Sequence, residues 1–199
     1  SPAEKLNLHK SLATAYGQTG RLDKAAAEMH TFLAGGGGTV ADWEAMAVLA
    51  SGARDCRGAL EALDHASPPG REANEQALKI RYSCYAQAKD TARATAVAEE
   101  LLRRYPRKEW YQAVLADLIA KKPDELAMLN ILRFGFERDY LQDETDYTKL
   151  ADSALDEGTT AEAQRVLERG ISKKAIKNMD KAQKLLKQAK DRAVDDAKS

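Results

Sequence analysis

The chain has 199 residues, of which 44% are hydrophobic and only 6% are aromatic. Its 31 basic and 31 acidic side chains cancel, which argues against electrostatic binding of the whole chain to nucleic acid or to a membrane surface. No apolar run approaches the roughly 20 residues that span a bilayer, so we expect no membrane span. Frequent alanine with few aromatic residues favours closely packed helices.

The first predicted elements are two amphipathic helices within residues 6–33, separated by a turn at Gly20. Apolar residues recur there at the three- and four-residue intervals of a helix. The apolar faces consist of Leu6, Leu8, Leu12, Ala13 and Tyr16 in the first helix, and of Leu22, Ala25, Ala26, Met29 and Leu33 in the second. Neither helix can bury such a face alone, so the hairpin needs neighbours of the same kind.

The same pattern returns 34 residues later, at Val40, and continues along the chain. Glycine and proline mark breaks between the repeats, at 35–38, 67–70 and 106. The pattern predicts a single all-α domain, a right-handed α-solenoid of about five helical hairpins with a C-terminal capping helix. The predicted repeats lie at about residues 6–39, 40–74, 75–106, 107–143 and 144–177, and the capping helix at 178–197.

The fourth repeat has the loosest pattern. Its first helix carries Trp110, but Asp117 falls where an apolar residue is expected. Proline is tolerated in the first turn of a helix, so Pro123 predicts the start of the second helix. The predicted apolar face of that helix consists of Leu126, Leu129, Leu132 and Phe136.

The segment from Ile171 onward is rich in lysine. It carries nine basic and four acidic residues, a net charge of +5, so the rest of the chain carries −5. Its apolar stripe predicts one long helix with a charged outer face, which the open end of a solenoid needs. The stripe consists of Met179, Ala182, Leu186, Ala189 and Ala193. The lysines indicate either a solvated cap or a contact with phosphate or an acidic protein.

The two cysteines, Cys56 and Cys84, fall on helices of consecutive hairpins. We expect Cys56 at the start of the second helix of one hairpin, and Cys84 late in the first helix of the next. These helix ends meet when antiparallel helices stack in order. The pair therefore forms either a disulfide or two small buried thiols.

The repeated residues resemble the tetratricopeptide repeat (TPR) family, whose pattern is W-x2-L-G-x2-Y, then A-x3-F, then a proline. The matching residues are Leu12, Ala13, Tyr16, Ala25 and Met29 in the first repeat, Trp43, Met46, Ala47 and Ala59 in the second, Tyr85, Ala94 and Pro106 in the third, and Leu150, Ala151 and Ala163 in the fifth. Small residues let paired helices approach closely, while larger ones fill the space between hairpins. The resemblance covers residues 6–177 and implies a protein-binding scaffold.

Two further stretches resemble a group of proteobacterial proteins of this family. One is the Tyr-Pro-x-Lys-x-Trp segment at Tyr105–Trp110, and the other is the Ala-x-x-Val-Leu-x-x-Gly segment at Ala163–Gly170. This resemblance implies a periplasmic protein of a TonB-type envelope system, with the cytoplasm as the alternative location.

The sequence contains no residue pattern typical of an enzyme, and we expect neither a cofactor nor a metal ion. His9, His30 and His65 share no helix face and have no cysteine or carboxylate cluster to complete a metal site. The glycines at 35–38 are not followed by the Lys-Ser/Thr pair of a phosphate loop, so we interpret them as a spacer.

The first helices of stacked hairpins are expected to line a concave groove. The predicted protein-binding residues are Asn7, Lys10, Thr14, Lys79, Ser83, Tyr111 and Leu115, and Glu44, Val48, Gln76 and Gln87 are expected on the same face. Tyr111 and Leu115 form either a peptide-anchoring patch or core contacts, of which we favour core contacts. The asparagines of a chaperone-type carboxylate clamp are absent, because Thr14 follows Lys10 and Ser83 follows Lys79.

We therefore predict a non-catalytic scaffold that holds an extended segment or a helix of a partner protein in this groove. The alternative is a structural subunit, such as a homodimer, that associates with itself through its C-terminal helix or its convex face.

Overall fold

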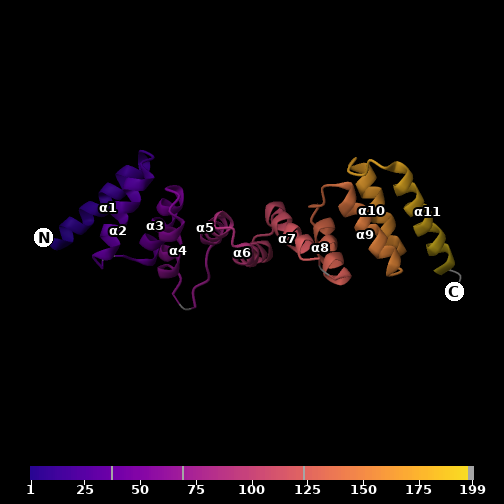
Figure 1. Cartoon of the computed structure of the whole chain (residues 1–199), viewed down its shortest axis with the longest axis horizontal. Helices are drawn as coiled ribbons and strands as arrows, with labels where there is room; N and C mark the ends of the chain where they lie inside the picture. Colours follow the sequence, from indigo (N-terminus) through magenta and orange to yellow (C-terminus); the bar gives the residue numbers. More distant parts are fainter. Residues whose placement is uncertain (37, 69, 123, 197–199) are drawn as a thin grey trace. The chain divides into compact units, whose positions relative to one another are not determined.

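The computed structural model describes residues 1–36, 38–68, 70–122 and 124–196, with side chains up to residue 192. In these ranges the chain forms eleven α-helices and no strand, which confirms the all-α prediction (Figure 1). The helices are α1 (Pro2–Gln18), α2 (Leu22–Ala34), α3 (Val40–Gly52), α4 (Cys56–His65), α5 (Glu75–Gln87), α6 (Thr91–Arg104), α7 (Lys108–Ala120), α8 (Glu125–Glu137), α9 (Glu144–Asp156), α10 (Thr160–Ser172) and α11 (Met179–Asp196). Gly37, Pro69 and Pro123, which the sequence places at helix breaks, lie outside the described ranges, as do residues 197–199.

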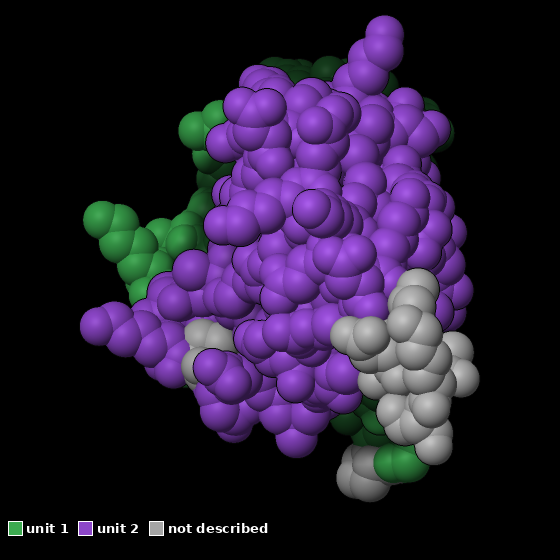
Figure 2. Space-filling view, turned by 90° about the vertical axis from the view of Figure 1, so that its right-hand side faces the viewer, with its two compact units in different colours: residues 1–110 green, residues 111–199 purple. Residues whose placement is uncertain are grey.

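The helices pack into two compact units, Ser1–Trp110 and Tyr111–Ser199, which are coloured separately in Figure 2. In the first unit, α1 pairs with α2, α3 with α4 and α5 with α6, and each hairpin contacts the next. In the second unit, α9 pairs with α10, and these helices contact α8 on one side and α11 on the other. That the whole chain forms one solenoid domain stays a prediction.

Alanines occupy the small positions of the repeat pattern and are fully buried. Ala13, Ala47, Ala59, Ala151 and Ala163 are all 0% exposed. Each was matched to a small position of the repeat pattern, and a larger side chain there would force the helices apart. The burial of these alanines confirms the packing that the repeat predicts.

The turns inside the hairpins share one backbone conformation. Gly20, Arg54, Lys89, Lys122 and Gly158 all have positive φ, from 51° to 78°. After four of these residues, the next N–H reaches back five residues to a carbonyl oxygen. These hydrogen bonds join Arg21 to Tyr16 (2.9 Å), Asp55 to Ala50 (2.8 Å), Asp90 to Tyr85 (2.9 Å) and Thr159 to Ala154 (2.8 Å). Such a Schellman closure ends the first helix, and its recurrence accounts for the regular length of the hairpins.

Glycine in place of Lys89 is expected to raise the free energy of unfolding by about 0.5–1 kcal/mol, because a residue with a Cβ is strained at φ 57°. Urea unfolding followed by circular dichroism measures the change. The matched control is Ala96→Gly, at an exposed position inside α6, which should lower the free energy of unfolding by about 1 kcal/mol. A loss of similar size in both variants would contradict the assigned strain.

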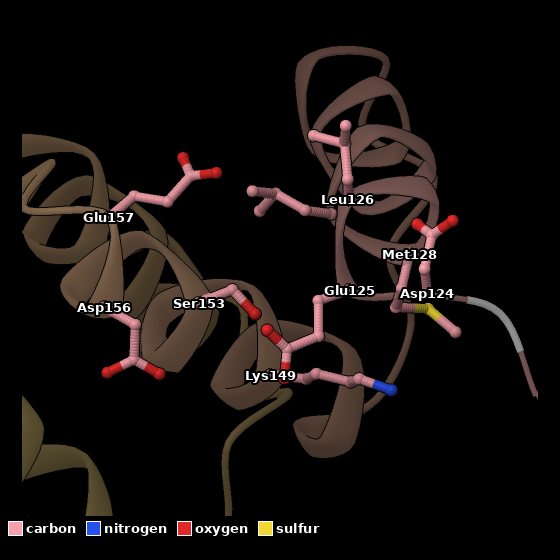
Figure 3. Close-up of a pocket in the computed structure, with 9 residues that line it drawn as sticks. Asp124, Glu125, Leu126, Met128, Lys149, Ser153, Asp156 and Glu157 are labelled. Carbon is pink, nitrogen blue, oxygen red and sulfur yellow. The ribbon is translucent and has the colours of Figure 1, made fainter.

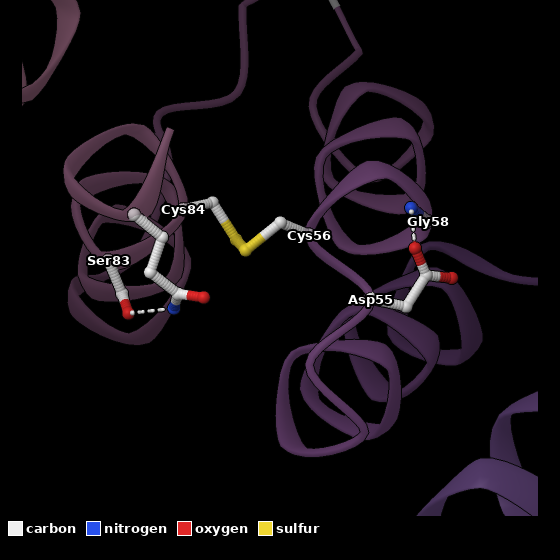
Figure 4. Close-up of a disulfide and its surroundings, with 6 residues drawn as sticks. Asp55, Cys56, Gly58, Ser83 and Cys84 are labelled. Carbon is white, nitrogen blue, oxygen red and sulfur yellow. Dashed lines mark hydrogen bonds between the residues drawn. A yellow bond between two sulfur atoms is a disulfide. The ribbon is translucent and has the colours of Figure 1, made fainter. Parts of the chain in front are cut away.

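A disulfide joins Cys56 at the start of α4 to Cys84 in α5, with the two Cα atoms 5.2 Å apart (Figure 4). Of the two alternatives left by the sequence, the structure therefore contains the disulfide. Asp55 caps the same end of α4 by accepting a hydrogen bond from the N–H of Gly58 at 2.9 Å. The bond connects the second hairpin to the third.

Arg133 connects α8 to α10 in the second unit. Its Nη2 and Nε donate to the two carboxylate oxygens of Glu162 at 2.6 and 2.8 Å, and Nη2 also reaches Glu157 at 2.8 Å. The hydrogen bonds from Arg133 hold the pKa of Glu162 below its ordinary value of 4.5. This ion pair therefore stabilises the fold above about pH 4.5 and loses its effect as the pH falls below that value.

Replacing Glu162 by Gln is expected to cost about 1–2 kcal/mol at pH 7. The difference in the free energy of unfolding between variant and wild type should narrow as the pH falls from about 4.5 through the lowered pKa of Glu162, because the wild-type carboxyl group then becomes protonated as well. Urea unfolding measured from pH 3 to pH 8 tests this, with Glu168→Gln on the exposed face of α10 as the control. A gap that stays constant with pH would exclude the ion pair as its cause.

Four apolar residues lie differently from the prediction. Leu8 and Leu126 are 58% and 62% exposed, although the sequence assigned both to apolar faces. In α11 the stripe that is buried consists of Ala182, Leu185 and Ala189, whereas Leu186 is only half-buried and Met179 is 40% exposed. Leu185 and Leu186 fit a three- or four-residue step equally well, so spacing alone could not choose between them. The side chain of Ala193 lies outside the described part.

Candidate functional site

A first hollow lies between the first helices of the second and third hairpins. It has a volume of about 230 Å³ and lies between α3 and the first two turns of α5. Leu63, Ala77 and Ile80 form its buried floor, while Val48 stands 46% exposed at its side. An apolar side chain of a partner could contact Val48 here without any rearrangement of the core.

The polar rim of this hollow is fixed by hydrogen bonds. Glu44 accepts one from Arg71 at 2.9 Å and one from Asn74 at 3.0 Å. Asn74 in turn caps α5 by accepting from the N–H of Ala77 at 2.9 Å. The carboxylate of Glu44 is therefore oriented in advance, which lowers the entropic cost of binding a partner's polar group.

A second hollow of about 640 Å³ follows along α5 and is much more open. It is lined by Lys79, Tyr82, Ser83, Ala86, Gln87, Glu109 and Trp110. Tyr82 and Trp110 meet edge to face at 5.2 Å and make its aromatic side. The indole Nε1 of Trp110 is buried and finds no hydrogen-bond acceptor among the described residues, so packing alone holds the ring.

The only lysine that lines this second hollow is already paired within the chain. Lys79 Nζ lies 2.8 Å from Glu75, and Arg107 contacts the same carboxylate at 2.9 Å. The hydrogen bond from Lys79 lowers the pKa of Glu75. A partner's carboxylate would have to compete with Glu75 for Lys79, so the hollow does not select strongly for an acidic ligand.

The predicted groove residues do not all meet. Lys79 and Ser83 lie together in the second hollow, where Gln87 donates a hydrogen bond to the Ser83 hydroxyl at 3.2 Å. Asn7 and Thr14 are exposed on α1 but line neither of these hollows. Their role in binding stays a prediction.

Lys10 forms an ion pair that connects the first two hairpins. Its Nζ lies 2.7 Å from the buried carboxylate of Asp42 in α3. Burial acts against the charge of Asp42, but hydrogen bonds from Lys10 and Thr39 outweigh it and lower the pKa. Lys10 therefore has a structural partner, and its use in binding would require that this pair opens.

Tyr111 and Leu115 were named as groove residues that form either a peptide-anchoring patch or core contacts, with core contacts favoured. They are only 1% and 8% exposed, so neither can anchor a peptide. Tyr111 packs against Phe134 and Tyr140, with ring centroids 6.4 and 5.7 Å away. Its hydroxyl has no hydrogen-bond partner in the described part of the chain, and burial raises its pKa. The core-contact alternative is the one that fits.

Sequence reasoning missed the aromatic side of the second hollow. Neither Tyr82 nor Trp110 was predicted to line the groove, and Trp110 is only 7% exposed. The two rings contact each other, and both residues also line the hollow. The spacing of apolar residues cannot show that one side chain both packs in the core and lines a hollow.

The described residues contain no group of three or more His, Cys, Asp or Glu side chains placed to hold a metal ion. His9 instead contacts Glu28 at 2.6 Å, and His65 stacks on Trp43 with ring centroids 4.2 Å apart. Among the described residues, no helix is long and apolar enough to cross a membrane.

Comparison with known proteins finds similarity among solved structures. A scan against protein-family models and a search of curated protein sequences each found no match. Among solved structures, the chain is similar to a tetratricopeptide repeat protein from Parabacteroides merdae, with a TM-score of 0.43 and 14% sequence identity. The similarity covers 92% of this chain and 70% of that protein. The fold described above rests on the helices themselves: the chain is a series of α-helical hairpins.

Proposed function

We propose that the chain is a non-catalytic scaffold that binds an extended segment or a helix of a partner protein across α3 and α5. The observation that supports this most is that α5 lines both hollows, with Gln76 and Ile80 at one and Lys79 and Ser83 at the other. A segment laid across α5 can reach both hollows at once. Open neighbouring hollows suit a polypeptide better than a small molecule, which prefers an enclosed cavity.

The character of the face supports a neutral, mixed partner segment. The first hollow offers an apolar contact at Val48, and the second offers aromatic and amide groups at Tyr82 and Gln87. Of its charged residues, Glu44 and Lys79 are already paired within the chain, and Glu109 also lines the second hollow. Apolar contact and hydrogen bonds, rather than net charge, would then give the affinity.

We also propose a periplasmic location, because disulfides form and persist in oxidising compartments. Participation in a TonB-type envelope assembly rests on the sequence resemblance alone. Alkylation of thiols in intact cells, with and without prior reduction, tests the location. Labelling of both cysteines without reduction would favour the cytoplasm.

Photo-cross-linking in the native host tests the proposed face. A photoreactive benzoylphenylalanine replaces Val48 or Ser83, and the controls carry it in place of Glu61 or Ala96, which are exposed on α4 and α6. We expect positions 48 and 83 to cross-link to one segment of one partner, and the controls to give none of that product. Equal cross-linking from all four positions would contradict the face.

The same experiment, together with light scattering at several concentrations, distinguishes self-association from binding of a different protein. Cross-links from Val48 or Ser83 to a second copy, in a stable oligomer, would favour the structural-subunit alternative. A monomer that cross-links to a different protein would favour the scaffold.

A further inference from the structure

A third hollow, of about 400 Å³, lies in the second unit between the start of α8 and the exposed side of α9 (Figure 3). It is lined by Asp124, Glu125, Leu126, Met128, Leu129, Lys149, Ser153, Asp156 and Glu157. It shares no residue with the two hollows on α5. It also lies between the second helix of one hairpin and the first helix of the next, rather than along a row of first helices.

The apolar part of this hollow is open to a partner. Met128 and Leu129 are buried at 4% and 3% exposure, whereas Leu126 beside them is 62% exposed. The sequence places Leu126 on the packing face of its helix, one turn before Leu129. The structure instead leaves this leucine against the hollow, where covering it would remove apolar surface from water.

The rim carries strong negative charge. Its four carboxylates and one lysine give a formal charge of −3. Arg133, outside the hollow, bonds to Glu157, and Asp124 caps α8 by accepting from the N–H of Ala127 at 2.7 Å. Glu125 and Asp156 form no ion pair with any described residue.

The position of two of these acids is costly for the fold. Asp156 is the last residue of α9 and Glu157 is its C-cap, where the carbonyl end of the helix is itself partly negative. An acidic side chain at this end typically costs about 0.3–1 kcal/mol. Residues that violate a local rule without a packing reason concentrate at functional sites. Asp156 is exposed, so packing does not account for it.

We propose that this hollow binds a basic segment of a separate protein, in which lysine or arginine residues flank one leucine- or methionine-sized side chain. The apolar side chain covers Leu126, and the flanking cations pair with Glu125 and Asp156. Charge complementarity selects the occupant, because an acidic or neutral segment would leave the rim carboxylates uncompensated. With the face on α5, the chain then holds two segments of opposite character.

The chain's own lysine-rich helix fits the hollow less well. Lys184, Lys187 and Lys190 are exposed on α11, but Leu185 between them is only 8% exposed. Met179 at the start of this helix is 40% exposed, but Asp180 follows it directly. A second copy that offered Met179 to Leu126 would therefore bring an acidic side chain to the negatively charged rim as well. The occupant is therefore a segment of a different protein.

A peptide titration on the full-length chain tests the proposal. The probe is the capped peptide Gly-Lys-Lys-Leu-Gly-Lys-Lys-Gly, and two matched peptides carry Ser in place of Leu or Glu in place of every Lys. Methyl NMR signals of Leu126 and Met128 report on the site. We expect saturable shifts with the first peptide, affinity about tenfold weaker with the Ser peptide, and no shift with the Glu peptide.

Variants of the protein complete the test. The affinity for the first peptide should fall about tenfold in Leu126→Ser, and likewise in the double variant Glu125→Gln/Asp156→Asn. It should not change in the controls, which are Leu8→Ser and the double variant Glu61→Gln/Glu99→Gln. Equal affinity in all variants, or no shift in the wild type at low salt, would overturn the proposal. So would a homodimer that Leu126→Ser dissociates, because a second copy would then be the occupant. None of these variants alters the hollows on α5. A failure of the peptide titration would therefore leave the proposed binding face on α5 untouched, and a failure of the cross-linking would leave this hollow untouched.

Discussion

Replacing both Cys56 and Cys84 by alanine is expected to lower the free energy of unfolding by about 3–4 kcal/mol. The disulfide closes a loop with a sequence separation of 28, and removing it restores the conformational entropy of that loop to the unfolded chain. Alanine is the better replacement because Cys84 is 1% exposed, and a buried serine hydroxyl would add a cost of its own. Urea unfolding followed by circular dichroism measures the change.

Hydrogen exchange should locate the loss. Because the bond joins α4 to α5, protection should fall most in the second and third hairpins and least in α9 and α10. Wild-type protein treated with dithiothreitol is the matched control and should behave as the double variant does. A change of less than about 1 kcal/mol would mean that the hairpins dock equally well without the bond.

Alanine in place of Gly135 is expected to lower the free energy of unfolding by about 2–3 kcal/mol. On helix propensity alone this substitution in α8 would gain about 1 kcal/mol. The added methyl group, however, would meet the ring of Tyr111, with Cε2 only 2.7 Å away. Phe134 and Tyr140 enclose that ring, so it cannot move aside.

Two further variants isolate this contact. Gly17→Ala in α1 is the matched control, because its methyl group would have only an ordinary contact of 3.5 Å with Leu49, and it should be neutral or stabilising. In a Tyr111→Leu background, Gly135→Ala should cost less than about 0.5 kcal/mol. A cost that is the same in both backgrounds would show that Tyr111 is not the obstacle.

The sequence predicted the helices and their closest contacts because those depend on period and residue size. The alanines at 13, 47 and 151 stand at one place in the pattern and those at 59 and 163 at another, and each is fully buried. The turn at Gly20 recurs in later hairpins, but the sequence does not show this. Arg54 and Lys89 occupy the position of Gly20 but are not glycines, so only the backbone reveals that they share its conformation.

The candidate site was less accessible to sequence reasoning. Lys79 and Ser83 line the same hollow, whereas Lys10 and Tyr111 have structural partners. An ion pair between α1 and α3 depends on the relative positions of two helices, which residue spacing does not contain. The exposure of Leu126 escaped prediction for the same reason, since a leucine in register is buried only where a neighbouring element covers it.

The bond between α4 and α5 also affects how the chain responds to force. When the protein is pulled from its two ends, the residues between Cys56 and Cys84 bear no load while the bond is intact. About 90 Å of extended backbone is thus withheld from the stretched length. A reductant would release this length in a single step. The end-to-end length of the fully stretched chain would therefore report whether the disulfide is intact or reduced.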